Sequence, residues 1–153
     1  MIIDYKHLES LQKEKTVFEA GVFDLLHPGH VSLFEQIKNQ FPEYLLIVGV
    51  MCDKRVKALK GESRPVLDEK QRVKMVDAVK YVDYSFIYPF DDLSKPNWYE
   101  VPKKLKPRYI FAEEGSPIDA KKLKQMGTTL VYFSKREDIS TTKIIKRIKK
   151  NGE

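Results

Sequence analysis

A continuous apolar segment, residues 44–50, limits the possible folds of this chain more than any other stretch. It lacks polar alternation, which is typical of a central parallel strand that helices cover on both faces. A shorter β-prone segment, residues 16–20, precedes it, and Val31, Phe34 and Ile37 recur at helical spacing between the two. This order of strand, helix and strand predicts an α/β fold.

The size and composition of the chain predict one domain. Its 153 residues, 42% of them hydrophobic and 33% charged, are typical of a globular protein with a substantial core. We therefore predict a single domain over residues 1–153, with residues 1–15 as an N-terminal helical extension. No apolar run reaches membrane-spanning length, the start lacks the pattern of a secretory signal, and one cysteine excludes an internal disulfide, so a cytoplasmic location is expected.

The charge balance limits the possible partners. The chain has 28 Lys and Arg against 22 Asp and Glu, and its net charge of +6 suits nucleic acid, an anionic membrane or small phosphorylated substrates. The basic residues are mostly interleaved with acids, and the sequence has neither a ladder of aromatic and basic residues nor a glycine-rich RNA motif. We therefore expect a small phosphorylated molecule as partner, with no nucleic acid and no membrane.

Residues 21–30 (Gly-Val-Phe-Asp-Leu-Leu-His-Pro-Gly-His) combine two imidazoles with a helix start, directly after the first predicted strand. The N–H groups and the dipole of a helix N-terminus favour an anion such as a phosphate. Two other interpretations stay open for His27 and His30: a metal-binding pair, although no cysteine or third matched ligand is near, and solvated loop histidines. The ordered pattern of strand, Gly-x-Phe-Asp, two apolar residues, His-x-Gly-His and helix is more specific than the pair alone.

A second motif, residues 139–145 (Ile-Ser-Thr-Thr-Lys-Ile-Ile), begins a basic amphipathic helix near the other end of the chain. Ser140 suits the N-cap position. Hydroxyl groups, backbone N–H groups and a cation at one helix start again favour an anion. We predict that Ile144, Ile145 and Ile148 form the buried face of this helix.

Together these motifs resemble the His-x-Gly-His nucleotidyltransferase superfamily, often called cytidylyltransferase-like, over about residues 17–148. Residues 60–66 look like the sugar-phosphate branch of the superfamily, the ADP-heptose synthase type, more than the glycerol-3-phosphate cytidylyltransferase branch. The resemblance implies a Rossmann-like single domain, with a parallel sheet of about five strands and helices on both faces.

The resemblance also implies a reaction. An NTP, either CTP or ATP, gives its nucleoside monophosphate to a sugar phosphate, a polyol phosphate or a headgroup phosphate, and pyrophosphate leaves. Mg²⁺ bridges the triphosphate, since protein cations alone would neutralise its charge poorly. No residue of the chain is expected to be a metal ligand, and members of the superfamily frequently form homodimers.

By the same resemblance, His27 and His30 hydrogen-bond the α-phosphate, where donors that are placed in advance need no reorganisation during the reaction. Gly29 lets the phosphates approach the backbone closely. Lys60 or Lys57 reaches the triphosphate, with Lys60 favoured. The other candidates for nucleotide binding are Gly21, Val22, Phe23, Asp24, Glu113, Arg136, Ser140, Thr141 and Thr142.

The middle of the chain adds one more candidate for the catalytic set. Residues 68–71 (Asp-Glu-Lys-Gln) have the form of a capping box, which predicts a helix start near Asp68. Arg72 follows in the first turn, where a cation is unfavourable unless a negative group faces it. The resemblance assigns Arg72 to nucleotide binding, while a salt bridge to Asp68 or Glu69 is the alternative.

Two departures from the superfamily leave a second function open. Glu113 and Glu114 precede Gly115, where the superfamily commonly has glycine followed by acidic residues. Residues 135–138 (Lys-Arg-Glu-Asp) replace the Arg-Thr-Glu-Gly of glycerol-phosphate members, so that Arg136 takes the place of their arginine. The alternative hypothesis is a non-catalytic module on the same fold, which binds a nucleotide for regulation or assembly.

Overall fold

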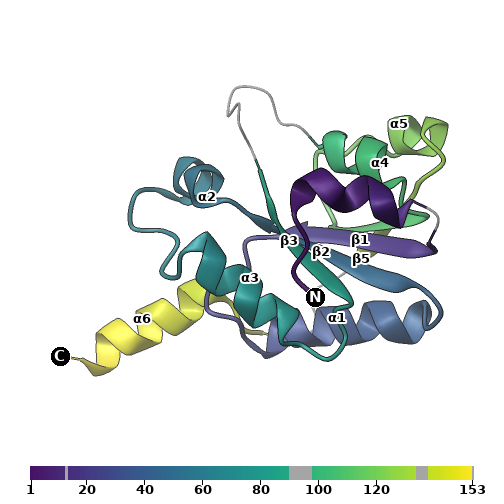
Figure 1. Ribbon diagram of the computed structural model, residues 1–153. Helices are drawn as coiled ribbons and strands as arrows, with labels where there is room; N and C mark the ends of the chain where they lie inside the picture. The colour runs from purple at the N-terminus through teal and green to yellow at the C-terminus, as the bar shows by residue number, and fades with distance from the viewer. Residues whose placement is uncertain (13, 90–97, 134–137, 153) are drawn as a thin grey trace.

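The computed structural model describes residues 1–12, 14–89, 98–133 and 138–152 of this chain. These residues form a five-stranded parallel sheet in the order β3-β2-β1-β4-β5 (Figure 1). The strands are β1 (Thr16–Gly21), β2 (Leu45–Met51), β3 (Tyr84–Tyr88), β4 (Tyr109–Glu113) and β5 (Thr129–Phe133). The predicted Rossmann-like α/β fold is confirmed.

Helices cover both faces of the sheet (Figure 1). Side chains from α1 and α3 pack on one face, and side chains from η1, α4 and α5 pack on the other. In the described ranges, the helices are the 3₁₀ helix η1 (Tyr5–Leu11) and the α-helices α1 (Pro28–Gln40), α2 (Asp53–Lys60), α3 (Glu69–Asp77), α4 (Glu100–Leu105), α5 (Ala120–Gln125) and α6 (Thr141–Asn151).

The strand β2 shows why the apolar segment has no polar alternation. Leu46 and Val48 pack under α1 and α3, whereas Ile47 packs on the side of η1 and α4. All three side chains are fully buried. Since the strand is covered on both faces, every position along it favours an apolar residue.

The strand order reverses beside β1. The chain builds β2 and β3 on one side of β1, and then returns to build β4 and β5 on the other side. Open α/β sheets bind ligands at the carboxyl ends of the strands at such a reversal. The histidine-containing residues 21–30 follow β1 there, and Glu114 and Gly115 follow β4, so the fold brings both segments to one edge of the sheet.

The start of α3 is formed as the sequence predicts. The Asp68 carboxylate accepts a hydrogen bond from the backbone N–H of Gln71 at 2.8 Å, and the Gln71 side chain accepts one from the backbone N–H of Asp68 at 3.0 Å. This reciprocal pair satisfies two backbone donors at the helix start. The capping box is therefore confirmed.

The predicted buried face of α6 is wrong at Ile148, whose exposed fraction is 62%. Ile144 and Ile145 are half-buried, but the later turns of α6 extend past the sheet and the other helices (Figure 1). Apolar periodicity shows that a helix has an apolar side, and it does not show that a neighbouring element covers that side.

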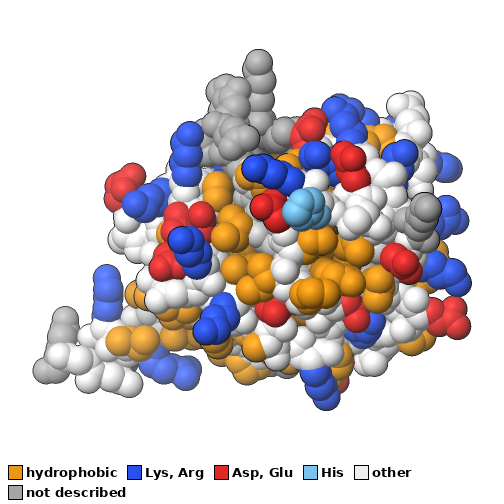
Figure 2. Space-filling view, in the orientation of Figure 1, with side chains coloured by type: hydrophobic (Ala, Val, Ile, Leu, Met, Phe, Trp, Pro, Cys, Tyr) orange, Lys and Arg blue, Asp and Glu red, His pale blue; other side chains and the backbone are white. Residues whose placement is uncertain are grey.

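The surface carries charges of both signs. Figure 2 shows basic and acidic side chains interspersed around apolar ones on the face that it presents. Among the described helices, none is long and apolar enough to cross a bilayer.

Candidate active site

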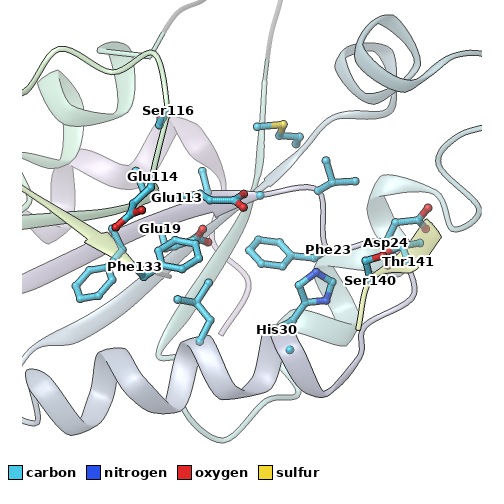
Figure 3. Close-up of a pocket in the computed structure, with 18 of the residues that line it drawn as sticks. Glu19, Phe23, Asp24, His30, Glu113, Glu114, Ser116, Phe133, Ser140 and Thr141 are labelled. Atoms are coloured by element: carbon cyan, nitrogen blue, oxygen red, sulfur yellow. Dashed lines mark hydrogen bonds between the residues drawn. The ribbon is translucent and has the colours of Figure 1, made fainter. Parts of the chain in front are cut away.

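One cavity of about 720 Å³ opens at the reversal of the sheet (Figure 3). Its walls come from the end of β1 with the histidine loop (residues 21–30), the first turns of α1, the segment after β4, and the start of α6. These elements come from both ends of the chain. The sequence-predicted candidates that line this cavity are Gly21, Val22, Phe23, Asp24, His27, Gly29, His30, Lys60, Glu113, Ser140, Thr141 and Thr142.

The two imidazoles are stacked on each other. Their ring centroids lie 3.8 Å apart with an angle of 21° between the planes. His27 is the N-cap residue of α1, and its backbone N–H donates to Nδ1 of His30 at 3.4 Å. Since Nδ1 of His30 accepts this bond, Nε2 is the ring nitrogen that can carry a proton and act as a donor. The edge contact between the His30 and Phe23 rings, at 5.3 Å, further fixes its orientation.

The backbone of the histidine loop adopts a conformation that side chains normally avoid. Phe23 and Leu25 have φ angles of 51° and 49°, in the left-handed region. Such strain persists only where the surroundings impose it, and it is concentrated at functional sites. The buried Phe23 ring packs on Phe34 of α1, which holds this unusual turn in place.

Gly29 is required by the packing around His27. A Cβ atom at Gly29 would lie 3.1 Å from the His27 ring and 3.3 Å from Cγ2 of Ile139. Any larger residue would therefore press on the imidazole. The predicted close approach of phosphates to Gly29 stays a prediction, but the ring contact already explains the glycine.

Asp24 has a structural role that the sequence did not predict. Its carboxylate is fully buried and accepts hydrogen bonds from Nε of Arg64 at 3.0 Å and from the backbone N–H groups of Val66 and Leu67 at 2.9 and 3.0 Å. The side chain is therefore engaged in fixing the segment between α2 and α3 against the histidine loop. Asp24 also lines the cavity, so its predicted contact with a nucleotide stays a prediction beside this structural role.

The start of α6 is tied directly to the histidine loop. The Thr141 hydroxyl donates a hydrogen bond of 2.6 Å to the backbone carbonyl of Asp24, and both groups are buried. Ser140 caps the helix by accepting from the backbone N–H of Lys143 at 3.2 Å, which confirms the predicted N-cap. Ser140 and Thr142 line the cavity beside this bond. The two motifs, from opposite ends of the chain, therefore meet at one cavity.

The structure separates the two candidate lysines. Lys60 lines the cavity. Lys57 does not, and its amine lies 3.9 Å from the carboxylate of Glu62 on the surface. Of the two, Lys60 is therefore placed to meet a bound ligand.

Arg72 is not placed as predicted. Its side chain is fully buried, and it donates to the backbone carbonyls of Val22 at 2.6 Å, Met51 at 2.8 Å and Leu67 at 2.9 Å. Its ion pair is with Asp53 at 2.6 Å, rather than with Asp68 or Glu69. Since these acceptors surround the guanidinium, Arg72 positions the carboxyl ends of β1 and β2 and does not reach the cavity.

Gly21 and Arg136 were also predicted to bind the nucleotide. A Cβ atom at Gly21 would lie 2.9 Å from the Phe23 ring, so this position needs glycine for the turn to close. Arg136 lies outside the described residues.

Glu19 is a cavity residue that sequence reasoning missed. It lies on β1, it is only 5% exposed, and its Oε2 has no hydrogen-bond partner among the described residues. Burial raises the pKa of the Glu19 carboxyl to about 8, and the negative charge of Glu113 adds to the effect. An acid inside the otherwise β-prone segment 16–20 was the signal that could have revealed it.

The Glu19 carboxyl makes stability depend on pH. The folded protein keeps this proton up to about pH 8, whereas the unfolded chain releases it near pH 4.5, so stability falls as pH rises through that window. Between about pH 4.5 and pH 8, we expect the free energy of unfolding of the native protein to fall more steeply with pH than that of Glu19→Gln. The difference between the two slopes should reach about 1.4 kcal/mol per pH unit. Urea unfolding of both proteins across the window measures this difference. Parallel pH profiles would contradict the assignment of the raised pKa.

The parallel sheet reverses its strand order beside β1, and paired imidazoles and a hydroxyl-rich helix start surround one cavity there. These features define a Rossmann-like α/β protein with a candidate site for an anionic ligand. Comparison with known proteins refines this class. The chain belongs to the cytidylyltransferase-like family, whose profile matches residues 18–147. This membership confirms the predicted family.

Individual relatives support the assignment. The chain is 31% identical over 153 residues to the bifunctional protein HldE of Desulfatibacillum aliphaticivorans, an alignment that covers 95% of this chain and 29% of that protein. It is 33% identical over 141 residues to the FAD synthase of Archaeoglobus profundus, covering 86% of this chain and 84% of that enzyme. The lipopolysaccharide core biosynthesis protein from Thermoplasma volcanium GSS1 has a similar structure, with a TM-score of 0.63 and 25% identity over 81% of this chain and 99% of that one. The chain thus spans less than a third of the HldE protein and most of the other two.

Proposed function

We propose that this protein transfers a nucleoside monophosphate from an NTP to the phosphate of a small acceptor and releases pyrophosphate. The observation that carries the proposal is the hydrogen bond between Thr141 and the Asp24 carbonyl. It fixes the hydroxyl-rich start of α6 beside the two stacked imidazoles, so that one triphosphate can meet both. Family membership supports the same reaction class.

The proposed reaction is a single displacement. An oxygen of the acceptor phosphate attacks the α-phosphorus of the NTP, a new P–O bond forms, and the bond from the α-phosphorus to the bridging oxygen breaks. Pyrophosphate leaves with that oxygen, and no covalent enzyme intermediate is formed. His27 and His30 donate to the α-phosphate as negative charge grows on its oxygens, and their stacked arrangement is set before the substrate binds.

The start of α6 holds the leaving group in this proposal. Ser140 and Thr142 offer hydroxyl groups, and the first turn of the helix offers backbone N–H groups and the positive end of its dipole. Lys60 supplies a cation to the same cavity. These groups stabilise the charge that develops on the pyrophosphate, which lowers the barrier to bond breaking.

We expect Mg²⁺ to enter this site together with the triphosphate. Among the described residues, no group of three His, Cys, Asp or Glu side chains is arranged to hold a metal ion. Mg²⁺ commonly binds through substrate phosphates and water rather than in an all-protein cage. Bound in this way, it would neutralise charge on the triphosphate beside the cation of Lys60.

For the acceptor, we propose a chemical class and no single compound. The names of two relatives, an FAD synthase and a lipopolysaccharide core biosynthesis protein, refer to different chemistry. We propose a phosphorylated small molecule, and the test set consists of sugar phosphates, polyol phosphates, headgroup phosphates and flavin mononucleotide.

A pyrophosphate-release screen tests the proposal. Each of the four NTPs is combined with each acceptor in the presence of Mg²⁺, and release is followed with a coupled enzyme assay. We expect release that requires both an NTP and one class of acceptor. Tight NTP binding without release for any pair would contradict the proposal and support the non-catalytic module.

A further inference from the structure

Asp24 connects three separate parts of the candidate active site. Its carboxylate binds the segment between α2 and α3, and its backbone carbonyl accepts the hydroxyl group of Thr141 at the start of α6. Asp24 itself belongs to the histidine loop and lines the cavity, beside Ser140 and Thr141 (Figure 3). A negative charge is therefore built into the end of the cavity that the proposed function gives to the phosphates.

Water does not screen this charge, because the exposed fraction of the Asp24 side chain is 0%. The effective dielectric constant of a buried environment is far below that of bulk water, so a buried charge acts strongly on its neighbours. An uncompensated carboxylate at this place would repel the phosphates of a bound nucleotide. A site for a triphosphate therefore needs a positive charge against Asp24.

Arg64 supplies this positive charge. Its Nε lies 3.0 Å from the Asp24 carboxylate, and its side chain is only 11% exposed. Arg64 is absent from the described residues that line the cavity, whereas Asp24 is one of them. The guanidinium group therefore acts on a bound ligand through Asp24 and not by direct contact.

Holding the segment in place does not by itself explain an arginine at this position. The backbone N–H groups of Val66 and Leu67 already donate to the Asp24 carboxylate at 2.9 and 3.0 Å. Nη2 of Arg64 is buried without a hydrogen-bond partner among the described residues, which costs free energy. What Arg64 adds beyond the backbone donors is a full positive charge.

We propose that Arg64 is a positioning residue for the nucleotide, which neutralises the buried Asp24 carboxylate at the cavity wall and so allows the site to hold a triphosphate. This inference rests on the proposed function. It assigns the charge balance of the phosphate end to a residue of the segment between α2 and α3.

Arg64→Gln tests this inference, because it removes the positive charge and keeps a polar side chain. The dissociation constants of ATP, ADP and AMP, and of CTP, CDP and CMP, are measured without acceptor. We expect the Kd of the triphosphates to rise by about 10- to 100-fold, the size of one charge interaction at an intermediate dielectric constant. The rise should become smaller from triphosphate to monophosphate. An equal rise for all three would overturn the inference, since a distorted site does not depend on ligand charge.

The double variant that combines Asp24→Asn with Arg64→Gln separates charge from structure. It disturbs more contacts than Arg64→Gln alone, but it leaves no buried charge unpaired. We therefore expect it to bind the triphosphates within about threefold of the native protein, as coupled charges require. A larger loss would overturn the inference, whether or not Arg64→Gln itself folds. Urea unfolding shows which variants are folded.

Arg108→Gln is the matched control, because Arg108 is exposed, precedes β4 at the amino end of the sheet, and lies outside the residues that line the cavity. Its substitution removes the same charge and should leave each Kd unchanged. A loss of affinity in Arg108→Gln as large as that in Arg64→Gln would show a general charge effect and overturn the inference.

Binding and transfer separate this inference from the proposed function. Charge-dependent losses in Arg64→Gln without any release of pyrophosphate by the native protein would support the role of Arg64 and contradict the proposed reaction. Native affinity in Arg64→Gln would overturn the inference, even if the protein were an active nucleotidyltransferase.

Discussion

The variant His30→Ala is expected to lose about 100- to 1000-fold in the rate of pyrophosphate release, because it removes one prepositioned donor from the α-phosphate. The ring of His30 stacks on His27 and lines the cavity, so its loss removes the donor without removing a core side chain. The rate is measured with the NTP and acceptor that the screen identifies. Circular dichroism and urea unfolding show whether the fold is kept.

His7→Ala provides the control for this experiment. His7 is exposed on η1, away from the residues that line the cavity, and its substitution should leave the rate unchanged. A rate for His30→Ala within about threefold of the native rate would count against the whole site assignment, since it is far below the loss expected for such a donor.

Arg72→Met should cost about 3–5 kcal/mol of folding free energy, because breaking a buried ion pair leaves the partner groups without compensation. The substitution would strip the donors from three backbone carbonyls and from the Asp53 carboxylate. The carbonyls of Val22 and Met51 lie at the carboxyl ends of β1 and β2, so the histidine loop would also lose its support. Urea unfolding at neutral pH measures the loss.

Lys74→Met is the matched control for Arg72, because Lys74 is an exposed residue of the same helix α3. Its substitution should change the free energy of unfolding by less than about 0.5 kcal/mol, as is usual for surface positions. A loss of under about 1 kcal/mol for Arg72→Met would show that the buried network is not the main support of this edge of the sheet.

Local patterns predicted the elements of this fold well. The continuous apolar segment became a strand buried on both faces, and the Asp68 capping box begins α3 as expected. The pattern did not predict α2, whose sequence Asp-Lys-Arg-Val-Lys-Ala-Leu-Lys has too few apolar residues to show a helical stripe. The resemblance implied a parallel sheet of about five strands, but the order of the strands was not predicted, because periodicity carries no information on which strands are neighbours.

The roles of individual site residues were harder to predict. Arg72 meets Val22 and Asp24 meets Val66, and these contacts join residues that are 50 and 42 positions apart in the chain. A motif shows that a charged residue occurs at a position, but only the packed structure shows which groups surround it. The resemblance assigned residues of both motifs to nucleotide binding, and the Thr141 hydroxyl does join the two motifs at one cavity.

Several expectations stay predictions. The homodimer, the cytoplasmic location, the Mg²⁺ requirement and the extent of the single domain each await their own measurement. The contact between the two ends of the chain at one cavity does not depend on any of them.

A crystal structure with a non-hydrolysable NTP analogue tests the central claim most directly. We predict that the α-phosphate lies within hydrogen-bond distance of the His27 and His30 rings, and that the β- and γ-phosphates lie against Ser140, Thr142 and the first turn of α6. Phosphates bound instead at Lys54 and Lys57 on the surface of α2, with the imidazoles and the start of α6 facing no phosphate, would contradict the account.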